Sequence, residues 1–160
     1  MRRRTFSILL TAVVIACAFN VSPATAQTNV RVLGTWVLDR DKSTFSGAKP
    51  DKRTMSFETV PGGIRHVTDS VLPGGFGFGD AFRVQYTFKI DGKDYPADAA
   101  MPVSTVSFKA INANTLERTG KYQNEVVETV TYVVSPDGKT LTVKGTVNGG
   151  GSSEQIFTKQ

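Results

Sequence analysis

The most informative part of the sequence is TVSFKAINANTLERTGKYQNEVVETVTYVVSPDGKTLTVKGTVNGGGSSEQIFTK (residues 105–159), in which short β-type runs alternate with turn sequences. The runs are rich in Val, Thr, Tyr and Phe, and the gaps contain Gln-Asn, Ser-Pro-Asp-Gly and Asn-Gly-Gly-Gly. Pro presets a turn backbone angle, and Gly and Asn tolerate the left-handed angles of tight hairpins. The pattern therefore predicts an antiparallel meander, with strands over residues 105–111, 115–122, 126–134, 140–147 and 154–159.

The chain before this segment continues the same pattern. Residues 82–90 alternate most clearly, with Val84, Tyr86 and Phe88 among the apolar residues of one face, which is the period of two of a half-buried strand. The remaining strands are predicted over residues 33–38, 54–60, 64–71 and 93–96.

These strands define the expected fold class. Consecutive antiparallel strands with short connections usually close into a barrel, because closure removes both sheet edges. We therefore expect an all-β, antiparallel up-and-down meander β-barrel of about 8–10 strands. The alternative is an open sandwich with Greek-key connections, for which only residues 39–52 and 72–81 are long enough.

Residues 1–26 have the pattern of an export signal. Three arginines at positions 2–4 precede an apolar run over residues 6–19, and Ala24-Thr25-Ala26 supplies a small–x–small cleavage site. The run is shorter than the roughly 20 residues that span a membrane. We expect one domain over residues 27–160, exported to the periplasm or secreted, without a transmembrane segment after cleavage. The alternatives are a retained N-terminal anchor, a lipid anchor through Cys17, and a twin-arginine signal.

Charge and residue counts exclude several classes of protein. The chain has 19 basic and 14 acidic residues. Without the three signal arginines the net charge is +2 and no basic cluster remains, which argues against nucleic-acid binding. Cys17 and His66 are the only Cys and His, so neither a two-His metal site nor a thiolate site is available. We predict no metal, no cofactor and no enzymatic activity, because Asp91, Asp94 and Asp98 lie in turn sequences where Asp is common.

Several polar residues fall on otherwise apolar strand faces. Arg118 and Tyr122 share a face with Leu116, and Glu128 and Tyr132 share the corresponding face of the next strand. A charge on a buried face must be paired or must meet a polar ligand. Arg118 and Glu128 therefore form either an internal ion pair or a polar anchor, and all four polar residues are candidates for the lining of a cavity.

His66 lies on a strand that has no clean apolar face. Such a strand either lines a polar-walled cavity or lies at a sheet edge, and a lone His is usually structural. The glycine-rich segment over residues 73–79 carries Phe76 and Phe78. It is either a simple connection or, together with Tyr95 and the segment to residue 102, the frame of a ligand entrance.

The sequence resembles the lipocalin and fatty-acid-binding-protein (calycin) superfamily, and in particular small exported bacterial proteins of unknown function with a lipocalin-like barrel. The resemblance rests on Gly34-Thr35-Trp36-Val37-Leu38 at the first strand and on further segments, namely residues 41–45, 91–96, 111–115 and 134–140. It implies a cavity for a small apolar molecule, and Lys159 in the place of the basic residue that packs over the Trp. Fatty-acid-binding proteins hold a carboxylate with Arg-x-Tyr on the last strand, whereas this chain has Phe157-Thr158-Lys159.

Two functions follow as hypotheses. The first is an exported, non-catalytic barrel that binds a small apolar or amphipathic ligand. The second is a protein–protein interaction module with a packed core, whose partner the sequence does not identify. Interior volume separates them, because a cavity of about 300 Å³ or more indicates a ligand.

Overall fold

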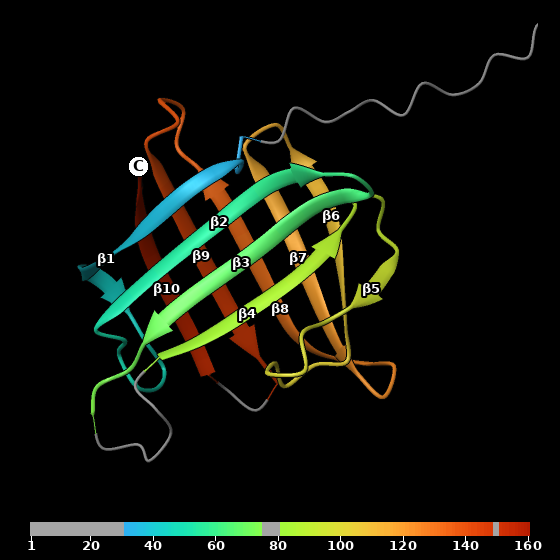
Figure 1. Ribbon diagram of the computed structural model, residues 1–160, viewed down its shortest axis with the longest axis horizontal. Helices are drawn as coiled ribbons and strands as arrows, with labels where there is room; N and C mark the ends of the chain where they lie inside the picture. The colour runs from blue at the N-terminus through green and yellow to red at the C-terminus, as the bar shows by residue number, and fades with distance from the viewer. Residues whose placement is uncertain (1–30, 75–80, 149–150) are drawn as a thin grey trace, which may run out of the picture.

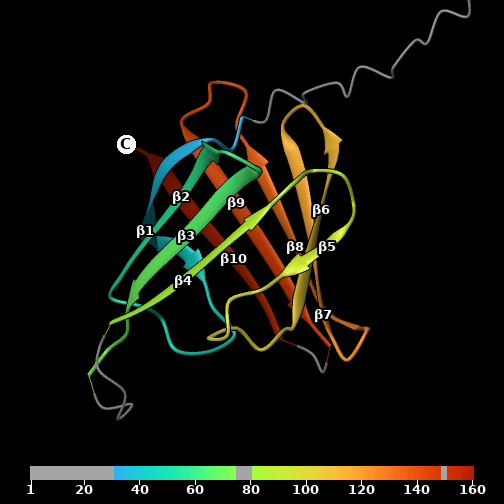
Figure 2. The ribbon, with the colours of Figure 1, turned by 45° about the vertical axis from the view of Figure 1, so that its right-hand side comes forward.

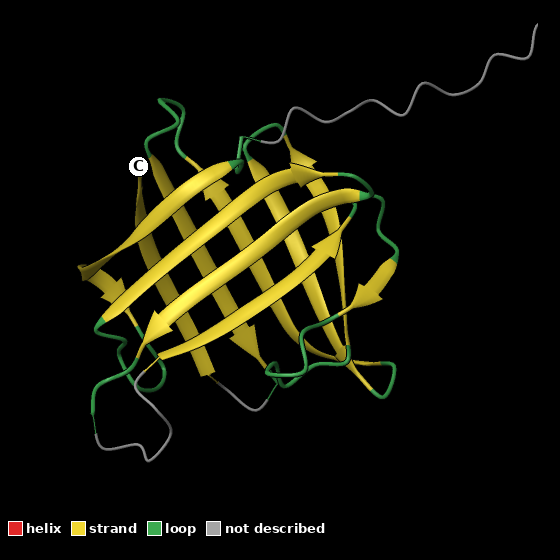
Figure 3. Ribbon diagram, viewed as in Figure 1, coloured by secondary structure: helices red, strands yellow, loops and turns green. Residues whose placement is uncertain are grey.

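A computed structural model describes residues 31–74, 81–148 and 151–160 of the chain. The described residues form ten β-strands and no helix (Figure 3). The strands are β1 (Gly34–Thr44), β2 (Lys52–Val60), β3 (Gly63–Val71), β4 (Ala81–Phe88), β5 (Asp94–Pro96), β6 (Thr105–Asn112), β7 (Thr115–Tyr122), β8 (Glu125–Val134), β9 (Thr140–Val147) and β10 (Gly151–Lys159). Over these same ranges, no helix has the length and apolar character needed to cross a membrane. The segment 1–26 and the aromatic pair Phe76 and Phe78 lie outside the described residues.

The strands form one antiparallel sheet in the order β4-β3-β2-β1-β10-β9-β8-β7-β6-β5. Each strand except β4 and β5 pairs with its neighbours in sequence, and β1 pairs with β10. Strands β1–β4 cross over the layer formed by β6–β10, and β5 lies beside β6 toward the free edge of β4 (Figures 1 and 2). The prediction of an up-and-down meander barrel is confirmed. The sheet is nearly closed, and the Greek-key sandwich is excluded.

The hairpins have the geometry that their turn sequences require. Gln123 and Asn124 both have positive φ angles, 51° and 66°, as expected of a two-residue hairpin loop that follows the strand twist. Gly138 ends the Ser-Pro-Asp-Gly turn at φ 73°, where a side chain would be strained. Local turn chemistry therefore sets the register of the predicted meander.

Strand β1 is longer than predicted: it continues through Thr44, although the charges after Leu38 favour a loop. The strand bends between Asp39 and Thr44, where the register with β10 shifts. The Ser43 hydroxyl bridges the bend, since it donates to the Asp39 carbonyl oxygen at 2.6 Å and accepts from the Ile156 N–H at 2.9 Å. A side chain thus replaces ladder hydrogen bonds, and polar residues continue the strand.

Trp36 of β1 is packed in the core and covered by Lys159. Trp36 is fully buried, its indole N–H donates to the Val32 carbonyl oxygen at 2.7 Å, and the Lys159 ammonium lies 5.1 Å from its ring centroid. This is within cation–π distance. A Cβ on Gly34 would lie 2.9 Å from the Lys159 side chain. The expected packing of Lys159 over Trp36 is confirmed, and Trp36 is a core residue.

Among the described strands, β4 and β5 are consecutive in sequence but are not hydrogen-bonded to each other, and core side chains span this gap. Phe88 of β4 stacks on Phe108 of β6 with ring centroids 3.6 Å apart, although these two strands are not paired. Both rings are buried. Aromatic packing therefore replaces hydrogen bonding where the barrel edges meet.

Candidate functional site

The interior of the barrel holds a cavity of about 240 Å³. It extends toward the end of the barrel that carries the connections β1–β2, β5–β6 and β9–β10, because Ser46, Met101 and Gly151 contribute to its wall. The volume is below the ~300 Å³ expected of a typical ligand pocket, but above the ~150 Å³ of an apolar cavity that admits benzene. The barrel is therefore not packed throughout.

The wall of the cavity is apolar in part and polar in part. Its apolar residues are Met55, Val84, Met101, Val130, Val143 and Val147. Its polar residues come from β2, β3, β4, β7, β8, β9 and β10 and include Arg53, His66, Thr68, Tyr86, Arg118, Glu128, Tyr132, Thr146, Ser153 and Gln155. Such a wall suits an amphipathic molecule better than a purely apolar one.

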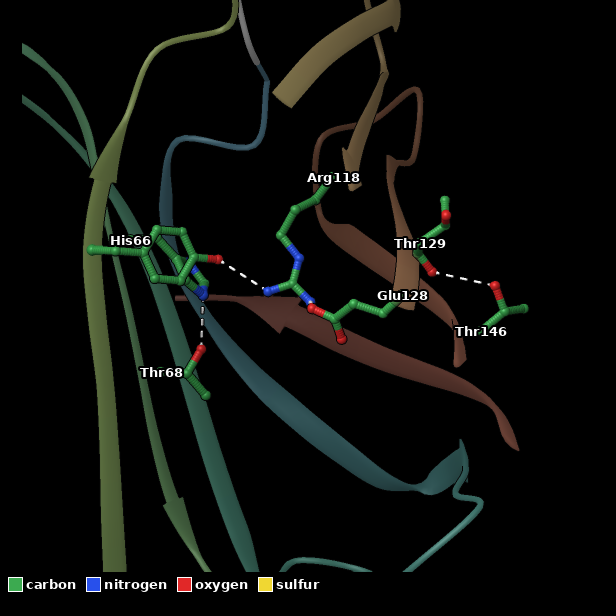
Figure 4. Close-up of polar contacts among 7 residues, drawn as sticks. His66, Thr68, Arg118, Glu128, Thr129 and Thr146 are labelled. Carbon is green, nitrogen blue, oxygen red and sulfur yellow. Dashed lines mark hydrogen bonds and ion pairs between the residues drawn. The ribbon is translucent and has the colours of Figure 1, made fainter. Parts of the chain in front are cut away.

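Arg118 and Glu128 form an ion pair in this wall. The Arg118 Nη2 lies 2.6 Å from the Glu128 Oε1, and the Arg118 Nη1 donates to the Tyr86 hydroxyl at 3.3 Å. Figure 4 shows the guanidinium reaching Glu128 on one side and extending toward His66 on the other. The side chains of the pair are only 9% and 13% exposed. The structure therefore shows the internal ion pair, and both of its side chains also line the cavity.

Gly120 makes room for this pair. It stands opposite Glu128 in the β7–β8 ladder. A Cβ at Gly120 would lie 2.5 Å from the Glu128 Cγ and 2.9 Å from Val103. Only glycine lets the Glu128 side chain lie over β7 and reach Arg118.

His66 is buried in the wall next to the ion pair. Its ring contacts Phe57 and Tyr86, with centroids 4.5 and 5.0 Å away, and its Nε2 lies 2.9 Å from the Thr68 hydroxyl oxygen (Figure 4). Burial, followed by the nearby Arg118 charge, lowers the pKa of His66 to about 3. The imidazole is therefore neutral near pH 7. Its strand β3 lies between β2 and β4, so the edge interpretation is wrong and the cavity-wall interpretation holds.

Three of the four residues predicted to line the cavity do so. Arg118, Glu128 and Tyr132 are in the cavity wall. Tyr122 is not, because it is the last residue of β7 before the hairpin turn and is 52% exposed. The register shift that follows Gly120 inserts its extra residue in β8, so the alternation of β7 is unbroken and it is the position of Tyr122 at the strand end that exposes it.

The predicted entrance is only partly described. Phe76 and Phe78 lie outside the described residues. Tyr95 is half-buried against the core, donates its hydroxyl proton to Asp91 at 2.9 Å, and does not line the cavity. From the same segment it is Met101 that reaches the wall.

Arg53 is a cavity residue that sequence reasoning missed. It lies on the inward face of β2 with Met55 and Phe57, and its guanidinium donates to the Ser70 hydroxyl and to the Gln155 side-chain oxygen. The signal was the alternation Arg53-Met55-Phe57. The strand predicted over residues 54–60 begins too late to include Arg53, whereas β2 begins at Lys52.

No protein-family model matches the sequence, and no curated protein sequence is significantly similar to it. Among solved structures, the chain is similar to fatty-acid-binding protein 1 of Echinococcus granulosus, with a TM-score of 0.54 and 16% identity over 81% of this chain and 97% of that chain. It is also similar to a Schistosoma mansoni fatty-acid-binding protein in complex with arachidonic acid, with a TM-score of 0.52 and 12% identity over 83% and 98%. The wild-type fluorescent protein UnaG gives 0.51 and 14% over 80% and 96%.

These structures are calycin-type β-barrels. Because the sequence identities are low, the likeness shows the fold alone. The chain therefore has the calycin-type barrel fold that the resemblance of its sequence segments, taken together, implied.

Proposed function

We propose that this chain is an exported, non-catalytic binding protein that holds one small amphipathic ligand inside its barrel. The observation that carries the proposal is the 240 Å³ cavity with a mixed apolar and polar wall. A protein that served only as a docking module would gain stability by filling this space, because cavities cost free energy. Export rests on the signal-like pattern of residues 1–26.

The likeness to fatty-acid-binding proteins supports a ligand in the interior of the barrel. One of those neighbours is a complex with arachidonic acid. In the present chain the cavity is smaller than a typical ligand pocket, so we propose a ligand about the size of a medium-chain acid or alcohol.

The roles of the acidic residues support the absence of catalysis. Asp91 accepts hydrogen bonds from Lys93 N–H and the Tyr95 hydroxyl, and Asp98 accepts from the N–H groups of Gln85 and Ala100. These carboxylates order turns and loops. The neutral, buried His66 is a poor proton donor near pH 7.

Gly145 allows a direct test. A Cβ there would meet its nearest atoms only at 3.5 and 3.8 Å, so Gly145→Leu projects a side chain into the cavity without moving the backbone. Octanoate and 1-octanol, titrated separately by calorimetry, are the probes. We expect saturable one-to-one binding of at least one of them, weakened by about tenfold or more in Gly145→Leu.

The matched control is Thr142→Leu, on the other face of the same strand. It should bind the probes as the unmodified protein does. If neither probe binds the unmodified protein, or if both variants bind equally well, the ligand is not held in this cavity and the proposal is wrong.

A further inference from the structure

Arg53 brings a positive charge into the cavity and holds it in a fixed position. Its Nε donates to the Ser70 hydroxyl at 2.9 Å, and its Nη1 donates to the Gln155 Oε1 at 2.7 Å. Ser70 is itself buried, with 2% of its surface exposed, and Gln155 comes from β10. The guanidinium is therefore oriented by two neutral partners on two different strands.

No carboxylate in the described part of the chain forms an ion pair with Arg53. The arginines at 40, 65, 83 and 118 each lie within 4.0 Å of an Asp or Glu. Burial lowers the pKa of Arg53, which means that its surroundings disfavour the charge. A guanidinium nevertheless stays protonated in proteins. Its charge is offset by none of the described side chains.

The ionised groups of the described cavity wall therefore have a net charge of one positive unit. Arg118 and Glu128 neutralise each other at 2.6 Å, and His66 is neutral. Arg53 is the remaining ionised group of the wall. An anion that entered the cavity would meet Arg53 without having to displace Glu128 from Arg118.

The guanidinium also keeps donors for such an anion. Arginine presents five N–H groups in a planar fork. Two of them are used by Ser70 and Gln155. The unused N–H groups can bind a carboxylate through two parallel hydrogen bonds, which are stronger than bonds between neutral groups.

We propose that Arg53 is the anion-binding residue of the cavity and that the ligand is an amphipathic monoanion, a carboxylate whose apolar part contacts residues such as Met55, Val84 and Val143. This inference rests on the proposed function and adds the charge of the ligand. It assigns the head group to Arg53 on β2 rather than to Arg118 on β7, which is already paired with Glu128.

The experiment compares octanoate with 1-octanol at pH 7 and low salt, because the two probes match in chain length and differ in charge. We expect the unmodified protein to bind octanoate about tenfold or more tightly than 1-octanol. Arg53→Gln should remove this preference by lowering the affinity for octanoate far more than the affinity for 1-octanol. Arg53→Lys should keep part of it, because the charge remains and the fork is lost.

Two further variants sharpen the test. Gln155→Glu places a carboxylate beside Arg53 and should remove the preference for octanoate without removing the arginine. Arg65→Gln, on the outer face of β3 where Arg65 pairs with Glu58, is the matched control and should behave as the unmodified protein.

The outcomes separate this inference from the proposed function. If the unmodified protein binds neither probe, the proposed function fails. If it binds both equally, or if Arg53→Gln and Gln155→Glu keep the preference for octanoate, the cavity binds ligands but Arg53 is not its anion site.

Discussion

Phe108→Ala is expected to lower the free energy of unfolding by about 3–5 kcal/mol, the usual cost of truncating a buried aromatic side chain. Phe108 is 1% exposed and stacks on Phe88, with an angle of 15° between the rings. It also approaches Tyr86 and Tyr132, with ring centroids 6.2 Å from each. Its loss removes the contact between β4 and β6, which are not hydrogen-bonded to each other, and leaves a void that rigid neighbouring strands cannot fill.

Urea unfolding followed by Trp36 fluorescence measures this effect. Phe82→Ala is the control, because Phe82 lies on β4 as well but is 39% exposed. It should cost less than about 1 kcal/mol, in the range of surface substitutions. If the two variants were equally stable, the stacked pair would not hold the barrel edges together.

Glu128→Leu is expected to cost about 3–5 kcal/mol, because it leaves the Arg118 charge buried without its partner. Arg118 is 8% exposed, and its other side-chain hydrogen bond goes to the neutral Tyr86 hydroxyl. The double variant Arg118→Met/Glu128→Leu should recover most of the loss, since replacing both members of a buried pair by apolar groups is often neutral or stabilising.

A double-mutant cycle by chemical denaturation measures the coupling between the two residues. A cost below about 1 kcal/mol for Glu128→Leu alone, typical of exposed pairs, would show that Arg118 reaches water or another partner in solution. If the cost of the double variant equalled the sum of the costs of Glu128→Leu and Arg118→Met, the two residues would act independently.

Local patterns predicted most of the fold. The hairpin sequences fixed the turns, as the positive φ angles of Gln123, Asn124 and Gly138 show. The alternation of strand residues identified the inward faces, and it placed Arg118 and Glu128 on facing strands. These features depend on a few neighbouring residues, so the sequence displays them directly.

Other features depend on contacts between distant segments. The extension of β1 past Leu38 requires Ser43 to bond to Ile156 of β10. Arg53 is held by Gln155, 102 residues away. No local pattern contains this information.

The resemblance and the polar residues on apolar strand faces indicated a cavity but not its volume. Whether a barrel interior is filled depends on the summed volume of side chains from all of its strands. Glycines such as Gly145 contribute to the open wall, and Gly120 determines where Glu128 lies. Counting apolar residues along the chain does not give that volume.

Native mass spectrometry of the protein, purified from its own source under mild conditions, tests the central claim most directly. We expect the mass of residues 27–160 plus one small acidic compound that is lost on denaturation, or one equivalent of octanoate taken up when that acid is added. A bare chain that takes up no octanoate would contradict a ligand held in the barrel.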